Sequence, residues 1–540
     1  SRQEALNGYM RPYAEAAKAG AGSYMSSFNE FEGIPASANK YLLTDLLRDE
    51  FGFNGFVVSD ATAVQEMIAH GIGDLQEVSA RGLQAGLDMD MNSDGFIGTL
   101  QKSLKEGRVS EKDIDLACRR ILEAKYKLGL FEDPYRYLGG ERTETDIWTA
   151  ESRQFAREAA HETQVLLKND GVLPLKKDAK IAVVGPFADN YSEMAGTWAS
   201  SNHTREFVTF YQGISEAATG KVTTAEGSWI LNDKDLEETV KYAIMKMFMP
   251  GMPTPPVHTV PQTTLISEAV QKARQADVIV ACVGELNNMS GEGSSRSDIS
   301  IPDAQRDLLK ALKATGKPIV MVLTTGRPLI IDWEKENMDA ILVTWALGAE
   351  AGHSLADFLF GDVNPSAKLT TSFPRSVGQE PLYYNHKNTG RPHPDYEPYR
   401  KFSSNYLDMV NGPLFPFGFG LSYTTFEYGP VTLSNDSMNQ NGTVKASVEV
   451  TNTGKVDGKE IVELYIHDVY SSSTRPVKEL RGFQKIDLKA GEKKTVEFEI
   501  SAETLSYYNH ELQWVCEPGD YEILIGPDSE RLQKHVLCVK

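Results

Sequence analysis

Cysteines are few in this sequence, and long apolar runs are missing from it. The four cysteines, Cys118, Cys282, Cys516 and Cys538, are widely spaced, and no two of them form a CxxC pair of the kind found in zinc and redox sites. Cys516 and Cys538 could meet across neighbouring strands, but two separate buried thiols are the favoured interpretation. No apolar stretch approaches the ~20 residues of a membrane span. An N-terminal signal pattern is not seen either.

Positive charge is also in short supply. The chain has 55 Lys and Arg residues against 75 Asp and Glu residues, which gives a formal net charge of −20. This balance disfavours nucleic acid or an anionic membrane as a partner, whereas a neutral small molecule or sugar is easy to accommodate. At 540 residues the chain is too long for one core. A prior of ~150 residues per domain predicts about three or four domains.

The first 135 residues alternate between helical and extended patterns. Three extended segments, at residues 22–29, 55–60 and 87–91, are each followed by a helical stretch. Such βα units form parallel sheets and build (β/α) barrels. Because three units cannot close a barrel, they would leave a strand edge and an apolar face open. We therefore expect residues 1–135 to be the C-terminal part of a (β/α)8 barrel of the TIM type.

The rest of that barrel is expected from a segment outside this chain or from a second chain. Any export signal would be lost with that segment. On this expectation the isolated 540-residue chain would show no turnover.

A second α/β region is predicted at residues 150–373, after a polar linker at residues 136–149. Four apolar segments in this region each end in a turn and are separated by helical stretches; they begin at Lys180, Asp277, Lys317 and Ala340. This pattern indicates a doubly wound, flavodoxin-like α/β sandwich, in which loops at the carboxyl ends of the strands hold ligands.

The C-terminal region follows a second linker at residues 374–401. Residues 402–540 contain alternating strand patterns, among them VKASVEVTNTG, KEIVELYIHDV, TVEFEI and DYEILIG, with Gly- and Asn-bearing turns between them. Such short strands are typical of a fibronectin type III-like β-sandwich.

One insert, Met245 to His258, is rich in Met and Pro. Met with His could bind a soft metal, but the Pro-rich setting and the lone His favour a surface loop or a partner contact. A contact of this kind would suit a homodimer.

The first candidate catalytic residue is Asp60, in the stretch GFVVSDATAV. A short buried strand ends there on an acid. The simpler interpretation is a helix cap, because Thr62 and Gln65 fit a capping box that leads into a helix over Ala63 to Ala69. From this stretch alone, the cap is favoured over a catalytic acid.

The second candidate is Glu292, in the loop ELNNMSGEGSSRSDISIP. It lies between Gly291 and Gly293, in a polar stretch too flexible for a helix or strand. A solvated loop acid is the simpler interpretation, and Glu285, at the tip of the preceding strand, is a competitor for any catalytic role. Both acids lie where an open α/β sheet presents residues to a ligand.

Several motifs occur in order along the chain: GFVVSD, SGEGSSR followed by ISIPDAQ, TTGRPL, the stretch from LFGDVNPSAK to NHKNTGRP, and PLFPFGFGLSYTTF. From Tyr9 to the end, the sequence resembles glycoside hydrolase family 3, most closely the periplasmic β-glucosidases of Gram-negative bacteria. The resemblance implies that Asp60, at the end of the seventh barrel strand, is the catalytic nucleophile. It implies that Glu292 is the general acid/base of a double displacement, with the two carboxyls about 5 to 5.5 Å apart.

The resemblance also implies sugar contacts, which we assign to Ser27 and Met25 on the preceding strand, to Ala61 and to Arg296. For Arg296, an exposed loop arginine is an equally good interpretation. Many family members have Trp or His where this chain has Ala61, and Tyr where it has Phe28. The family residues that grip the glycone come from earlier barrel strands and are not in this chain.

The function implied is that of a retaining, exo-acting β-glycosidase, first of all a β-glucosidase acting on terminal non-reducing β-D-glucosyl residues. A β-xylosidase of the same family is one alternative. A non-catalytic carbohydrate-binding or scaffold protein on the same fold is the other. The resemblance further implies a periplasmic or secreted enzyme that needs neither cofactor nor metal.

Overall fold

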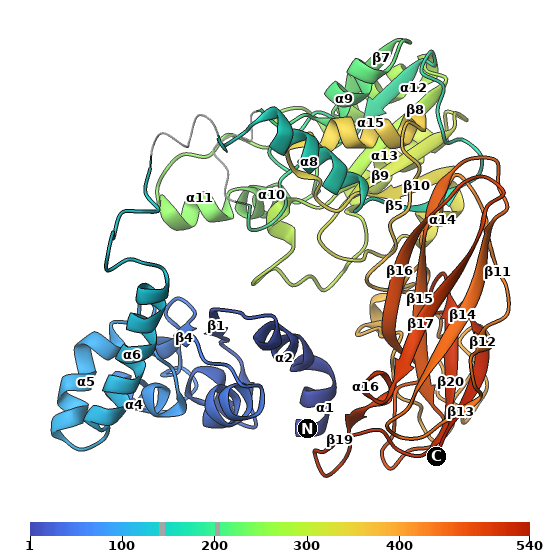
Figure 1. Ribbon diagram of the computed structural model, residues 1–540. Coiled ribbons are helices and arrows are strands. Elements are labelled where there is room, and N and C mark those ends of the chain that lie inside the picture. Colours follow the sequence, from blue (N-terminus) through green and yellow to red (C-terminus); the bar gives the residue numbers. More distant parts are fainter. Residues whose placement is uncertain (140–145, 200–205) are drawn as a thin grey trace. The chain divides into compact units, whose positions relative to one another are not determined.

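The computed structural model describes residues 1–139, 146–199 and 206–540 (Figure 1). The chain forms two compact units. The first consists of Ser1–Ile147 with Tyr507–Val515, and the second of Trp148–Ser506 with Cys516–Lys540. The predicted linker at residues 136–149 lies partly outside the described residues, and the predicted domain boundaries stay predictions.

Parallel βα units form the centre of the first unit. Strand β1 (Ser23–Ser26) pairs in parallel with β4 (Phe56–Ser59), and the register places Ser26 beside Ser59. The third predicted extended segment is reduced to a single parallel bridge between Val58 and Met89. A short hairpin, β2 (Glu30–Phe31) and β3 (Ile34–Pro35), follows β1. The predicted order of βα units is therefore present, whereas the closed barrel stays an expectation.

Helices surround these strands and share one apolar core with them. Val57 of β4 is buried in this core with Leu47, Val64 and Val78. The helices are α1 (Arg2–Glu4), α2 (Arg11–Lys18), α3 (Ala63–Glu66), α4 (Leu75–Ala85), α5 (Gly95–Lys105) and α6 (Glu111–Lys127), with π-helical segments at Ala5–Tyr9 and Tyr41–Glu50.

A hairpin from late in the chain, β18 (Tyr507–Tyr508) and β19 (Trp514–Val515), completes the first unit. The Asn7 side chain makes two hydrogen bonds to the backbone of this hairpin. It donates to the Tyr508 oxygen at 2.9 Å and accepts from the Tyr508 nitrogen at 2.8 Å.

A six-stranded sheet forms the α/β part of the second unit, in the order β5-β10-β9-β8-β6-β7. Only the β5–β10 pair in it is antiparallel. The four predicted strands are confirmed, and two further strands at the edges were not predicted. The strands are β5 (Val165–Asn169), β6 (Ile181–Val184), β7 (Val222–Ala225), β8 (Val278–Gly284), β9 (Ile319–Thr324) and β10 (Ala340–Val343).

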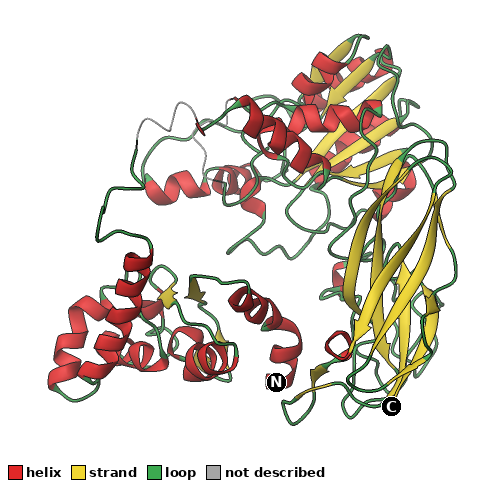
Figure 2. Ribbon diagram, viewed as in Figure 1, coloured by secondary structure: helices red, strands yellow, loops and turns green. Residues whose placement is uncertain are grey.

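Helices cover both faces of this sheet, as Figure 2 shows. One face packs against α8 (Ala150–His161), α9 (Phe210–Ala217) and α15 (Ala351–Phe360), and the other against α12 (Gln262–Gln275) and α13 (Asp303–Lys313). Every residue of β8 is buried, as expected for a central parallel strand covered on both sides. The predicted α/β sandwich is confirmed.

The predicted β-sandwich is confirmed as well. One sheet contains β11 (Phe426–Tyr428), β12 (Thr432–Leu433), β14 (Thr443–Asn452) and β17 (Lys493–Ser501). The other contains β13 (Ser437–Met438), β15 (Gly458–Asp468), β16 (Glu479–Leu488), β20 (Gly519–Gly526) and β21 (Gln533–Val539). A short helix, α16 (Ala502–Leu505), follows β17. Buried and exposed residues alternate along β14, because its alternate side chains face the core between the sheets.

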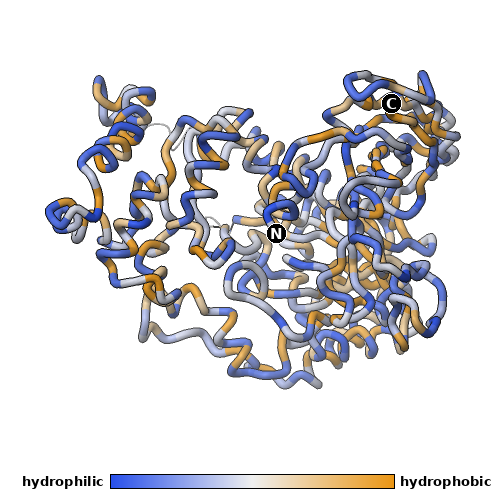
Figure 3. Tube along the Cα trace, turned by 90° about the horizontal axis from the view of Figure 1, so that it is seen from below, coloured by the Kyte–Doolittle hydropathy of each residue, from blue (hydrophilic) through white to orange (hydrophobic). Residues whose placement is uncertain are grey.

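Cys516 and Cys538 are separate thiols, as are Cys118 and Cys282. Hydrophobic and hydrophilic residues mix closely along the chain trace in Figure 3. Among the described residues, no helix combines the length and the apolar character that a membrane span requires.

Candidate active site

Asp60 directly follows β4, at the carboxyl end of that strand. The neighbouring segment fixes Ser59 there, because the Ser59 nitrogen donates to the Met89 oxygen at 2.9 Å and the Ser59 hydroxyl accepts from the Met91 nitrogen at 2.8 Å. The Asp60 carboxylate accepts a hydrogen bond from the adjacent Ala61 nitrogen at 2.6 Å. Asp60 itself is only partly buried.

The capping interpretation of this stretch is wrong. Thr62 takes a left-handed conformation, with φ of 63°, and its side chain makes no capping bond to α3, which ends at Glu66. The Thr62 hydroxyl donates to the Glu66 carboxylate at 2.8 Å instead. The backbone nitrogen of Gln65 donates a hydrogen bond to the Ser93 hydroxyl at 3.2 Å. The acid that ends β4 is therefore not required for starting the helix.

The other predicted residues of the first unit gather at the same edge of the sheet as Asp60. Because Ser26 pairs with Ser59, Ser27 and Asp60 are the first residues beyond two adjacent strand ends. Met25 is 55% exposed and Ser27 is exposed, so both are accessible at this edge. Ala61 is half-buried.

Glu292 lies in the second unit, in the loop that follows β8, and it is exposed. Its two neighbours have left-handed backbones, with φ of 96° at Gly291 and 66° at Gly293, which glycine adopts without steric cost. The loop packs closely, since a Cβ at Gly291 would lie 2.6 Å from Cγ2 of Thr197. The Thr197 hydroxyl also donates to the Asn287 oxygen.

Glu285 is held by two cations beneath this loop. Its side chain is fully buried, and Oε1 lies 2.7 Å from Nη1 of Arg296 and 3.3 Å from Nε of Arg327. Its other oxygen accepts from the Thr325 hydroxyl at 2.8 Å. Because the side chain is fully buried and both of its oxygens are already bound, neither oxygen is accessible to a glycosidic bond, so the competing acid/base assignment of Glu285 loses its support.

The two arginines connect Glu285 to the loop backbone. Nη2 of Arg327 donates to the Met289 oxygen and, at 2.6 Å, to the Ser294 oxygen, on opposite sides of Glu292. Arg296 donates to the Ser300 oxygen at 3.0 Å, and its side chain is largely buried. Arg296 therefore braces the loop, and its contact with a sugar stays a prediction.

A third carboxylate near the loop was missed in the sequence. Glu193 is 7% exposed and accepts a hydrogen bond from the Asn287 nitrogen at 2.8 Å. Burial raises the pKa of this carboxyl. It fixes the beginning of the loop, next to a hydrogen bond from the Asn288 side chain to the Val240 oxygen of α10 (Lys234–Lys241) at 3.1 Å. Its polar surroundings in the sequence give no signal that would single it out.

Metal-ligating side chains are not clustered at either place. Among the residues that the structure describes, no group of three or more His, Cys, Asp or Glu side chains is arranged to hold a metal ion.

Comparison with known families matches the chain in three parts. Residues 1–124 match the glycosyl hydrolase family 3 N-terminal domain, residues 164–423 its C-terminal domain, and residues 460–529 a fibronectin type III-like domain. Over 99% of this chain, a protein of Salmonella typhimurium named periplasmic beta-glucosidase is 47% identical, and 70% of that protein is covered. The chain belongs to glycosyl hydrolase family 3. The resemblance inferred from the motifs is thereby confirmed.

Other family 3 members are similar over the same length. A beta-xylosidase of Formosa agariphila is 39% identical over 97% of this chain and 70% of that protein. Among solved structures, a beta-glucosidase from Listeria innocua in complex with isofagomine has a TM-score of 0.90 and 38% sequence identity. The match covers 100% of this chain and 71% of that one.

Proposed function

We propose that the protein is an exo-acting β-glucosidase that hydrolyses terminal non-reducing β-D-glucosyl residues with retention of configuration. Family 3 membership and the beta-glucosidases among its similar relatives support this function. The observation that carries the assignment of the acid/base is the contrast within one loop. Glu292 is exposed, whereas Glu285 is buried and bound by two arginines.

In the proposed mechanism, the ionised carboxylate of Asp60 attacks the anomeric carbon of the sugar. The glycosidic bond breaks as Glu292 gives its proton to the departing oxygen, which leaves a covalent glycosyl ester on Asp60. Glu292 then takes a proton from water, whose oxygen attacks the anomeric carbon and releases the sugar with its original configuration. This chemistry requires a spacing of about 5 to 5.5 Å between the two carboxyls.

The sugar contacts belong to the same proposal. We assign Met25, Ser27 and Ala61 to the edge of the sugar site because they gather at the strand ends beside Asp60. The side chains of Ala61 and Phe28 are less polar than the Trp or His and the Tyr of many family members. Glucose is the proposed glycone, and xylose is the alternative, since a related protein is named a beta-xylosidase.

The test is hydrolysis of 4-nitrophenyl β-glucoside, 4-nitrophenyl β-xyloside and cellobiose by the full-length gene product and its variants. Asp60→Ala should abolish turnover of all three. Glu292→Ala should slow cellobiose hydrolysis by about 10²- to 10⁴-fold, because the leaving group then needs its missing proton. Added azide should restore turnover of the activated substrates by replacing the water that needs a base. The ratio of the two nitrophenyl rates identifies the glycone.

Two exposed acids serve as controls. The control variants are Glu66→Ala and Asp298→Ala. Glu66 lies close to Asp60 in the chain, and Asp298 lies on the same loop as Glu292. Both should leave the rates unchanged. No turnover of any of the three substrates by the unaltered full-length gene product would favour a carbohydrate-binding protein. Wild-type rates from Asp60→Ala would remove Asp60 as the nucleophile, and wild-type rates from Glu292→Ala would place the acid/base elsewhere.

Localisation and assembly complete the proposal. A periplasmic or secreted protein is supported by the name of the Salmonella relative. A homodimer is supported by α11 (Ala243–Phe248), which overlaps the start of the Met-rich insert and whose Ile244, Met247 and Phe248 are 55%, 77% and 73% exposed. The insert's His258 is buried against the Trp229 ring, with centroids 3.9 Å apart. Sedimentation velocity should detect a dimer that Met247→Glu dissociates, and a wild-type monomer would contradict it.

A further inference from the structure

A cavity of about 420 Å³ opens in the second unit, away from the loop of Glu292. Its walls come from the segment 372–413, which precedes the β-sandwich, and from Lys478, Ser529 and Glu530 of the sandwich. No residue of the loop 285–300 lines it. Its volume falls in the range of about 300 to 1,000 Å³ that is usual for small-molecule sites. We call it the Tyr383 cavity.

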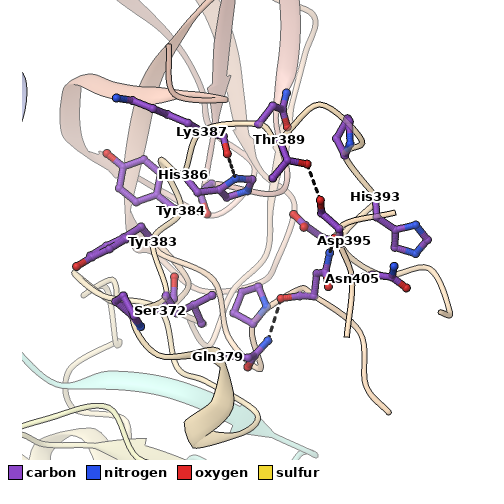
Figure 4. A pocket seen from close by; sticks show the side chains of 18 of the residues that line it. Ser372, Gln379, Tyr383, Tyr384, His386, Lys387, Thr389, His393, Asp395 and Asn405 are labelled. Atoms are coloured by element: carbon purple, nitrogen blue, oxygen red, sulfur yellow. Dashed lines mark hydrogen bonds between the residues drawn. The ribbon is translucent and has the colours of Figure 1, made fainter. Parts of the chain in front are cut away.

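Aromatic rings form one side of the Tyr383 cavity. Figure 4 shows Tyr383 and Tyr384 on one side of the lining and Asp395, His393 and Asn405 on the other. The Tyr384 ring stacks on Phe417, with centroids 4.4 Å apart, and its hydroxyl accepts from the Leu480 nitrogen at 3.2 Å.

Tyr384 is therefore fixed in place, whereas the ring of its neighbour Tyr383 is 56% exposed. The accessible Tyr383 ring offers a flat apolar surface with a polar edge. The C–H face of a sugar fits such a surface.

Charges in the lining balance. Two lysines, Lys387 and Lys478, stand against two acids, Asp395 and Glu530, and Nζ of Lys478 lies 3.4 Å from the Glu530 carboxylate. Burial, together with the negative charge of Asp395, raises the pKa of Glu530. A site without an excess of either sign gives no electrostatic preference to a phosphate, an acidic peptide or a cation. It suits a neutral ligand with many hydroxyls.

We propose that the Tyr383 cavity binds a neutral saccharide of one or two rings, at a site separate from the loop of Glu292. The Tyr383 ring stacks on the sugar beside Tyr384, while the Asp395 carboxylate, in the cavity lining, binds its hydroxyls. This site would hold a sugar whether or not Asp60 and Glu292 carry out hydrolysis.

Isothermal titration calorimetry of the Asp60→Ala protein with cellobiose and with laminaribiose tests the proposal, because no hydrolysis then interferes. The titration should contain a binding event with a Kd of about 1 mM that Tyr383→Ala, added to Asp60→Ala, weakens about tenfold. Asp395→Asn, which keeps the size of the side chain, should weaken the same event. Tyr470→Ala removes an 83% exposed tyrosine of the same unit that does not line the cavity, and should leave the event unchanged.

The outcomes decide between ligands. Loss of the event in Tyr383→Ala, with 4-nitrophenyl glucoside hydrolysis intact in the otherwise wild-type protein, supports a separate saccharide site. A titration in which neither Tyr383→Ala nor Asp395→Asn changes any event overturns the proposal. Equal binding of a neutral tripeptide in competition with cellobiose also overturns it, because the cavity would then be a peptide site.

Discussion

Replacing Glu285 by Gln should loosen the loop that carries Glu292. The substitution keeps the shape of the side chain but leaves Arg296 and Arg327 without the buried charge that they contact at 2.7 and 3.3 Å. Removing one partner of a buried ion pair typically costs about 3–5 kcal/mol. The arginine side chains are 19% and 20% exposed, so water compensates them in part, and we expect about 3 kcal/mol.

Urea denaturation followed by tryptophan fluorescence measures this loss as a lower midpoint of the second unit. Activity gives the second measurement. Because Glu292 would still be present but misplaced, hydrolysis of 4-nitrophenyl β-glucoside should fall, and azide should not restore it.

Glu334→Gln is the matched control. Glu334 is also fully buried, and it pairs at 2.9 Å with Arg306 of α13 and not with a residue of the loop. This variant should lose comparable stability and keep its activity. If Glu285→Gln were as stable as the wild type, the buried network would not brace the loop. If azide rescued it, Glu285 would be the acid/base.

Further predictions concern each part of the fold. Burial raises the pKa of Glu463 from 4.5 to about 7, so this carboxyl lowers stability as the pH rises between those values. Glu463→Gln should therefore stabilise the protein by up to about 3 kcal/mol at pH 8 and leave it unchanged at pH 4, in urea midpoints at the two pH values; equal gains at both would refute this. Gly284→Ala should cost about 3 kcal/mol or more in thermal denaturation, because φ is 149° and a Cβ would overlap the Thr324 oxygen. Its control is Gly98→Ala, which meets open space in a helix and should not destabilise. Ser110→Ala removes the capping box of α6 and should cost about 1 kcal/mol in the urea midpoint of the first unit, and an unchanged midpoint would count against the cap.

The sequence predicted the interior of the α/β sheet better than its edges. Strands β8, β9 and β10 are apolar throughout and end in turn residues, which is the pattern of strands buried on both faces. Strand β7 has the sequence VTTA and is mostly half-buried, so its pattern resembles a loop. Edge strands are specified by their neighbour as much as by their own residues.

At the candidate site, residue types could be predicted but partners could not. Thr62 and Gln65 fit a capping box on spacing alone, yet the backbone nitrogen of Gln65 donates to Ser93, which is distant in sequence. In the same way, Glu285 and Glu292 look alike as sequence, and one of the arginines that bind Glu285 alone, Arg327, follows the next strand of the sheet. Contacts of this kind depend on strand order.

The brace on the Glu292 loop has a consequence for how the loop tolerates change. Arg327 binds the carbonyl oxygens of Met289 and Ser294, which every residue type possesses. Substitutions at these two positions leave the acceptors in place, and the arginine itself is set by the pairing of β9 with β8. The loop can therefore exchange side chains while its backbone path is kept by the sheet beneath it, which would separate the choice of substrate from the position of the proposed acid/base.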